Sequence, residues 1–214
     1  MQNVVPVEAA LADRTLAGRR DAYAAEVRRL IDAAFAVMRE TGDIDPPVRD
    51  IVKAAGLSNQ AFYRHFASKD SLLLAVLADG HRQLVEYLRA RLASTKDPEQ
   101  QVRRWIDGVM AQARDPRAAD ATRPFALNGA RLADRFPDDL AASRTEILAT
   151  LSPSVQALGG TRDDAGLVCE LVLARMNDAI AHRRRPQPKE VEHLVGFCLA
   201  GISRQEPARS RRES

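Results

Sequence analysis

The segment from Pro47 to Lys69 constrains the fold of this chain more than any other part of the sequence. Its pattern predicts a short helix over Val48–Ala55, a turn at Gly56, and a second short helix over Asn59–His65. Gly56 stands where a chain that leaves a helix needs a left-handed residue, which glycine adopts without a steric clash. Two helices joined by such a turn form a helix-turn-helix, whose second helix can enter the major groove of DNA.

Two further features of this segment suit contact with phosphates. Ser58 is placed to cap the second helix, because its hydroxyl can accept a hydrogen bond from a backbone N–H one turn further on. No acidic residue occurs from Leu57 to Lys69, whereas Arg64, His65 and Lys69 lie near helix ends. Such a surface is typical of a segment that lies against a polyanion.

One helix precedes this motif and a longer one follows it. Apolar residues recur at helical spacing from Val27 to Met38, and Gly42 ends that helix. Ser68 and Asp70 mark the start of a helix that runs to about Leu92. The apolar stripe of the first helix can close a small core with the motif's own apolar residues, which are Ile51, Val52, Ala55, Leu57, Phe62 and Phe66.

In this order, the segments EVRRLIDAAFAVMRETG, VRDIVKAAGLS and AFYRHFASKDSLLLAVL resemble the DNA-binding domain of the tetracycline-repressor (TetR) family of bacterial regulators. The resemblance covers residues 24–84; no motif supports it beyond Lys96. It implies an all-α fold, in which a three-helix head is joined by a long helix to a helical ligand-binding and dimerisation domain. It also implies a dimeric repressor that a small ligand releases from palindromic operator DNA.

The chain departs from the family pattern at two places. Pro46 and Pro47 stand where the family usually has a threonine or serine that caps the first paired helix and touches a phosphate. Proline suits a first helical turn, so the fold is retained, and Asp45 could cap the helix instead. Val52 replaces a usual small alanine, which could widen the crossing of the two helices.

These patterns divide the chain into four parts. We expect a flexible N-terminal arm over residues 1–23, a helix-turn-helix domain over 24–84 with its motif at 47–66, a helical regulatory and dimerisation domain over 85–204, and a disordered tail over 205–214. In the third part, strand signals are nearly absent. Further helices are expected at about 98–114, 124–134, 136–158 and 161–179. The segment 183–189 then turns the chain into a last helix, which contains Val191 to Ile202.

The last two of these helices have strongly apolar faces. A hairpin that exposed them would leave a large apolar patch, which monomers avoid, so dimerisation is the better interpretation. A two-fold dimer also suits DNA, because its two recognition helices would read major-groove faces about 34–36 Å apart.

Charge and cysteine content restrict the partners and the compartment. The net charge of +3 is modest, so binding to polyanions over the whole surface is not expected. The basic residues Arg14, Arg19 and Arg20 suit either an arm that reaches DNA or a solvated leader. Neither a signal peptide nor a membrane span is evident, which favours the cytoplasm. Cys169 and Cys198 fall in apolar helical contexts and are expected to be buried thiols.

No catalytic constellation emerges, so we expect neither an enzyme, nor a metal site, nor a cofactor. The four histidines have no partner at metal-ligand spacing, and a phosphate loop or nucleophile elbow is lacking. The resemblance leaves a small-molecule site in the second half of the chain, although apolar helical positions suit a plain core equally well. The pocket candidates are Trp105, Met110, Phe125, Leu127, Phe136, Leu151 and Met176.

The DNA-binding candidates follow from position in the motif. Asn59 and Gln60 open the recognition helix, and their amides can make the paired hydrogen bonds that suit adenine. Ala61 could meet a thymine methyl group. Phosphate contacts are expected from Tyr63, His65 and Lys69, with Ser58 and Arg49 as weaker ones.

Two other functions remain open. One is a helical small-molecule-binding protein or enzyme whose helix-turn-helix is only structural. The other is a DNA-binding activator, or a repressor controlled by another protein.

Overall fold

The computed structural model describes residues 7–202, and every regular element in that range is an α-helix, which confirms the predicted all-α fold. The helices are α1 (Val7–Thr41), α2 (Val48–Ala55), α3 (Asn59–His65), α4 (Lys69–Leu92), α5 (Pro98–Arg114), α6 (Pro116–Leu127), α7 (Gly129–Arg135), α8 (Pro137–Ala157), α9 (Arg162–Ala181) and α10 (Pro188–Ile202). None of them is long and apolar enough to span a membrane.

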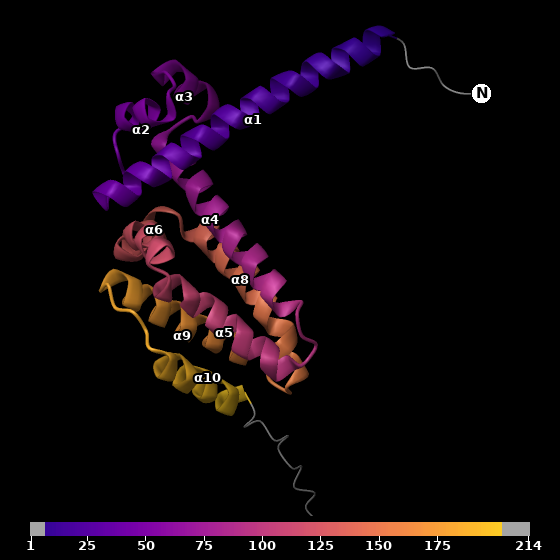
Figure 1. Ribbon diagram of the computed structural model, residues 1–214, viewed down its shortest axis with the longest axis vertical. Helices are drawn as coiled ribbons and strands as arrows, with labels where there is room; N and C mark the ends of the chain where they lie inside the picture. The colour runs from indigo at the N-terminus through magenta and orange to yellow at the C-terminus, as the bar shows by residue number, and fades with distance from the viewer. Residues whose placement is uncertain (1–6, 203–214) are drawn as a thin grey trace, which may run out of the picture. The chain divides into compact units, whose positions relative to one another are not determined.

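The chain divides between Val76 and Leu77 into two compact units, which we call the head and the body. The sequence pattern predicts the boundary at residue 84, which also lies within α4. In the head, α1 packs against α2, and α2 packs against α3 (Figure 1). The helices meet around a small buried core, whose most completely buried members are Leu30, Ala34, Met38, Ile44, Ile51, Phe62, Leu72 and Leu73.

The turn between α2 and α3 has the predicted geometry. Gly56 is left-handed, with φ 62° and ψ 37°, and its N–H donates to the carbonyl of Lys53. The hydroxyl of Ser58 accepts from the N–H of Ala61 at 3.1 Å, so the predicted cap of α3 is confirmed. These two local features fix where α2 ends and where α3 begins.

The start of α2 differs from the prediction. Pro47 occupies the position before the helix, without any side-chain cap. Asp45, the expected substitute cap, instead forms an ion pair with Lys69, with 2.7 Å between Oδ1 and Nζ. Val52 is accommodated as a buried residue, with 7% of its surface exposed.

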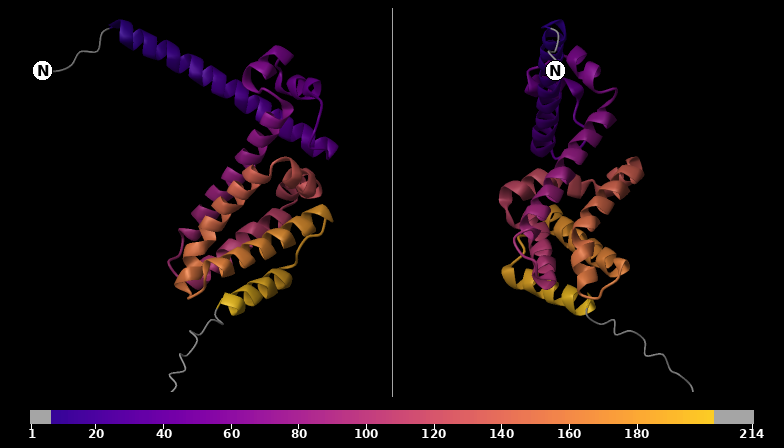
Figure 2. Two further views of the ribbon diagram at one scale, coloured as in Figure 1. Left: turned by 180° about the vertical axis from the view of Figure 1, so that it is seen from behind. Right: turned by 90° about the vertical axis from the view of Figure 1, so that its right-hand side faces the viewer.

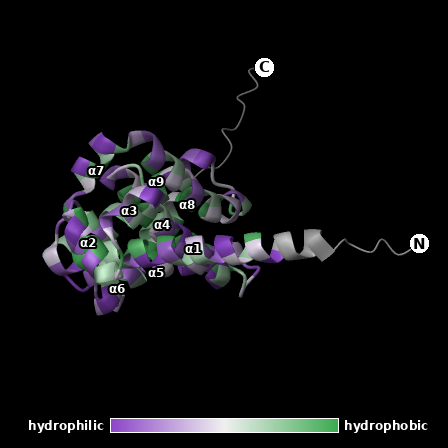
Figure 3. Cartoon of the chain, turned by 90° about the horizontal axis from the view of Figure 1, so that it is seen from above, coloured by the Kyte–Doolittle hydropathy of each residue, from purple (hydrophilic) through white to green (hydrophobic). Residues whose placement is uncertain are grey.

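The flexible arm predicted for residues 1–23 requires correction, because residues 7–23 form the first part of α1. The stretch after Pro6 contains no further proline before Thr41 and is rich in alanine, arginine and leucine, which favour helix. Residues 14–25 are exposed, and α1 extends past the α2–α3 pair (Figures 1 and 2). Hydrophilic and hydrophobic residues are interspersed along it (Figure 3). Residues 1–6 and the predicted tail at 205–214 lie outside the described residues.

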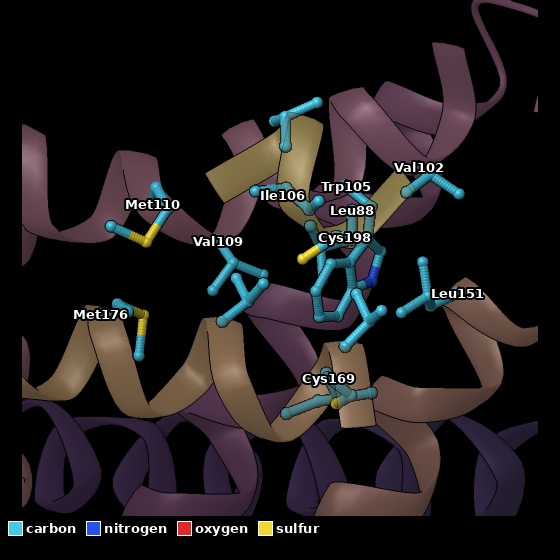
Figure 4. Close-up of a cluster of buried hydrophobic side chains, with 14 of the residues drawn as sticks. Leu88, Val102, Trp105, Ile106, Val109, Met110, Leu151, Cys169, Met176 and Cys198 are labelled. Carbon is cyan, nitrogen blue, oxygen red and sulfur yellow. The ribbon is translucent and has the colours of Figure 1, made fainter. Parts of the chain in front are cut away.

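The body is built around α5, which packs against α6, α8, α9 and α10. Trp105 of α5 is fully buried, and its Nε1–H donates to the hydroxyl of Thr150 at 2.8 Å. Figure 4 shows its ring among side chains from α4, α5, α8, α9 and α10. Cys169 and Cys198 belong to the same cluster, and both are the predicted buried thiols. Burial raises the pKa of each thiol to about 11.

One part of the body was predicted incompletely. The sequence pattern indicates a single helical piece at about 124–134, whereas the structure has α6 and α7, which are separated at Asn128. The side chain of Asp115 accepts hydrogen bonds from the N–H groups of Arg117 and Ala118, so α6 begins directly after it. The Asp115–Pro116 pair that ends α5 therefore also starts α6.

Candidate DNA-binding site

Helix α3 has one buried and one exposed face. Ala61 and Phe62 are buried, with 5% and 0% of their surfaces exposed, whereas Asn59 and Gln60 are exposed and Tyr63 is 62% exposed. A helix of seven residues is too short to be stable alone, so its orientation depends on the contacts of its buried face. The exposed face consequently presents two amides and a phenol in a fixed arrangement.

Two of the residues predicted to contact DNA lie on the inner face of α3. Ala61 packs into the core of the head. The imidazole of His65 is fully buried. Around the axis of the helix, Ala61 and His65 lie closer to the buried Phe62 than to the exposed Tyr63. This position places both residues on the inner face.

His65 contacts α1 instead of solvent. Its Nε2 lies 2.6 Å from Oε2 of Glu26, and the ring of Tyr23 packs edge-on at 4.3 Å between centroids. Because a carboxylate can only accept, Nε2 must donate this hydrogen bond. The hydrogen bonds from His65 and Arg64 lower the pKa of the Glu26 carboxyl.

Sequence reasoning did not include Arg64, Glu26 or Tyr23 among the site residues. The side chain of Arg64 is 55% exposed at the end of α3, and its guanidinium pairs with the same Glu26 oxygen. Glu26 precedes its partners by 38 and 39 positions in the sequence, so no local pattern could connect them. Residues 57–69 contain no acidic residue, but the surface that they form is not free of acidic groups, because α1 contributes the carboxylate of Glu26 to it.

The remaining predicted phosphate contacts are available on the surface to different degrees. The side chain of Arg49 is 81% exposed, and its Nε lies 3.3 Å from Oδ1 of the neighbouring Asp50. That of Lys69 is 40% exposed, and its ammonium keeps further donors beside the one that Asp45 occupies. Ser58 is exposed although its oxygen caps α3. These groups donate hydrogen bonds, as binding to phosphate requires.

The structure does not gather the pocket candidates into one site. Trp105, Met110, Leu151 and Met176 belong to the buried core of the body, and Met110 and Met176 lie at the same end of it (Figure 4). Of the others, Phe136 is buried, Phe125 is half-buried and Leu127 is 49% exposed.

A hollow of about 220 Å³ lies between α5, α9 and α10. Of the candidates, only Met110 lines it. Its other lining residues are Leu171, Arg175, Arg184, Pro186, Glu190, His193, Leu194 and Phe197. Apolar side chains thus adjoin two arginines, of which Arg184 is paired with Asp178 and Glu190.

Comparison with known proteins agrees with the geometry of the head. Residues 30–76 match the family of bacterial regulatory proteins described as the tetR family. The HTH-type transcriptional regulator CymR of Pseudomonas putida is 38% identical over 79 residues, which are 37% of this chain and 39% of CymR. The matched segment therefore spans about two fifths of the length of that relative.

Solved structures extend the likeness in fold to most of the chain. A TetR-family transcriptional regulator from Mesorhizobium loti superposes with a TM-score of 0.63 at 22% identity, over 84% of this chain and 96% of its own. A transcriptional regulator from Rhodococcus sp. Rha1 superposes with a TM-score of 0.61 at 26% identity. The superposition covers 82% of this chain and 95% of that regulator. Residues 30–76 are thus similar to the tetR family of bacterial regulatory proteins, and most of the chain shares its fold with solved regulators described as members of that family.

Proposed function

We propose that this protein is a transcriptional regulator that binds operator DNA in a sequence-specific manner as a dimer, and that it is a repressor which a small ligand releases. The observation that carries the proposal is the two-faced α3, whose exposed Asn59, Gln60 and Tyr63 are held in place by a buried inner face.

The roles follow from the chemistry of the exposed groups. Asn59 and Gln60 read base edges in the major groove, where a carboxamide pairs with the two hydrogen-bonding groups of adenine. Tyr63, Lys69 and Arg49 bind phosphates and set the position of the head on the duplex, and Ser58 assists them. Ala61 and His65 have no direct role at the DNA.

The first test compares binding to the DNA upstream of the protein's own gene with binding to a scrambled duplex, at two salt concentrations. Specific retention with a two-fold footprint is the expected result. Equal and salt-sensitive binding to both duplexes would mean that this fragment holds no operator, and genomic selection would then be used to find one. An absence of binding to any DNA at low salt would overturn the proposal.

The phosphate contact of Tyr63 has a matched control. Tyr63→Phe should weaken operator binding, because the hydroxyl that donates to phosphate is removed. Tyr87→Phe in α4 removes a phenol that is 37% exposed and accepts from Arg91, and it should leave binding unchanged. Equal affinities for the two variants would refute the assigned role of Tyr63.

Dimerisation is supported by the outward faces of α9 and α10. Leu167 and Phe197 are 66% and 64% exposed, which is unusual for such large apolar side chains. Small residues lie beside Phe197, and a Cβ added at Gly196 or Gly201 would meet no atom within 4 Å. Glycine is thus not required there by packing within one chain, whereas it would let the helices of a second copy approach closely.

Sedimentation of two charge variants tests this surface. Phe197→Glu should convert the dimer to a monomer and weaken operator binding, since one head alone contacts only half of a palindrome. Leu127→Glu changes another exposed apolar residue of the body, on α6, and should leave the dimer intact. A dimer that survives Phe197→Glu as well as Leu127→Glu would exclude this face.

The ligand is proposed to bind the body and to favour a state with weaker DNA affinity, with a coupling free energy of about 1–3 kcal/mol. The hollow beside Met110 combines apolar walls with Arg175, which suits a small apolar molecule bearing an anionic group. Thermal-shift screening of such acids, followed by release of operator DNA, tests this step. A ligand that stabilises the protein without releasing DNA would argue against induction.

A further inference from the structure

The end of α3 is attached to α1 by four side chains, which we call the Glu26 cluster: Tyr23 and Glu26 from α1, and Arg64 and His65 from α3. Oε2 of Glu26 accepts hydrogen bonds from both Arg64 and His65. The carboxylate thus joins one fully buried side chain and one that is 55% exposed. Tyr23 and Glu26 precede the segment that matches the family, residues 30–76.

For His65, the carboxylate of Glu26 is the essential partner. Nδ1 of the buried ring has no hydrogen-bond partner, so Nε2 makes the one polar contact of the imidazole within the described residues. Without Glu26, both ring nitrogens would be buried and unsatisfied, which is costly. The end of α3 would then shift to bring the ring to water, and the exposed amides at its start would move with it.

For Arg64, the same carboxylate is a competitor of DNA. Arg64 follows Tyr63 directly in the sequence, and it is the arginine that α3 exposes. Arginine binds phosphates strongly at any sequence. The ion pair with Glu26 opposes such contacts, because phosphate must displace a partner that is already bound.

We propose that Glu26 is a specificity-determining positioning residue of the head. It fixes the orientation of α3 through His65, and it holds Arg64 back from phosphate contacts that ignore sequence. This inference rests on the proposed function, since it concerns the choice between operator and other DNA. Nothing in the sequence of the recognition helix indicates it, because the deciding residue lies on α1.

Two substitutions separate the two effects. Glu26→Gln keeps an oxygen that can accept from His65 but removes the charge that holds Arg64. Binding to a scrambled duplex should therefore tighten, and the slope of log affinity against log salt should steepen by about 0.9, as for one additional phosphate contact. Glu26→Ala also removes the acceptor, so operator affinity should fall about tenfold, comparable to one mismatched base pair.

The control is Asp32→Asn, which removes a carboxylate from the same helix. Asp32 pairs with Arg28 on α1 and its side chain is 62% exposed, so the substitution removes a carboxylate and one ion pair from the same helix without removing a contact to α3. Asp32→Asn should change neither the affinity for the operator nor the affinity for the scrambled duplex. The double variant Glu26→Gln with Arg64→Gln should lose the gain in scrambled-duplex binding, because the cation that causes it is absent.

Binding of the variants of the whole chain to operator and scrambled duplexes is measured across a salt series. Tighter binding of Glu26→Gln to the scrambled duplex at a steeper salt slope, with weaker binding of Glu26→Ala to the operator, supports the proposal. Parallel losses on both duplexes at an unchanged salt slope would mean that Glu26 only stabilises the head, and the proposal would fail. If Glu26→Ala does not fold, as circular dichroism would reveal, Glu26→Gln still decides.

Failure of the proposed function is distinguishable from failure of this inference. A wild-type protein that does not prefer its operator contradicts the function. A wild-type protein that does prefer it, with Glu26 variants that discriminate equally well, contradicts only the role of Glu26.

Discussion

At the scale of single residues, the turn between α2 and α3 depends on the backbone of Gly56. Its φ of 62° is left-handed, and a Cβ added there would meet no atom within 4 Å. The cost of Gly56→Ala is therefore conformational and should be about 1 kcal/mol of head stability. Gly18 of α1 also has open space for a Cβ but is helical, so Gly18→Ala should instead stabilise by about 0.5–1 kcal/mol.

Urea unfolding followed by far-ultraviolet circular dichroism measures both changes. Their opposite signs are the decisive feature, because both variants add the same methyl group to the same unit. A loss of stability in both would mean that crowding, and not the sign of φ, determines the effect.

Residue roles were predictable where the cause is local. Gly56 and Ser58 act through backbone atoms within a few positions, so their spacing in the sequence revealed them. Ala61, His65 and Lys69 were predicted to touch DNA, yet the first two are buried and the third is paired with Asp45. The helices that pack on a short helix decide which of its side chains point inward. The arrangement of those helices could not be predicted from this single sequence.

At the scale of elements, the start of α9 shows how a cap couples to pH. The hydroxyl of Thr161 accepts from the N–H of Asp164 at 3.1 Å, and the Asp164 carboxylate accepts from the N–H of Thr161 at 2.7 Å. The Asp164 carboxylate also accepts from the hydroxyl of Thr161, and the two hydrogen bonds that it accepts, first from the N–H and then from the hydroxyl, lower its pKa below the usual 3.8. Because the folded state favours the ionised form, this stabilisation is present above pH 3.8 and is lost as the pH falls toward the lower, folded pKa.

Asp164→Asn should therefore destabilise the body at neutral pH, and its difference from the wild type should shrink in acid. Asp163→Asn removes a charge from the same first turn of α9 without removing a cap bond, so it isolates the contribution of the helix dipole. Urea unfolding followed by the fluorescence of Trp105, at neutral pH and well below pH 3.8, compares the three proteins. A difference that stays constant with pH would contradict the coupling.

Element boundaries were well predicted where capping signals mark them. The limits of α2, α3 and α5 agree with the sequence analysis, since glycine, serine or an aspartate–proline pair stands at each. The start of α1 was missed because helix-forming residues continue upstream without a stop signal. The start of α6 was missed because Asp115 was interpreted only as the end of α5.

At the scale of the whole molecule, the two units can be followed separately because the chain has one tryptophan. Trp105 is fully buried in the body, so its fluorescence reports on that unit, whereas circular dichroism reports on all helices. The head is small, and a unit of its size has little stability to spare. Phe62 is fully buried in it, and Leu151 is fully buried in the body.

Phe62→Ala should cost about 3–5 kcal/mol and unfold much of the head, because it opens a cavity in a small core. Operator binding and part of the helical signal should be lost, while the thermal transition of Trp105 stays close to that of the wild type. Leu151→Ala should destabilise the body by about 2–5 kcal/mol and should instead lower the temperature of the thermal transition that Trp105 fluorescence reports. An equal shift of that transition in both variants would show that head and body unfold as one cooperative unit through α4, and that a change in the head is therefore felt at the core of the body.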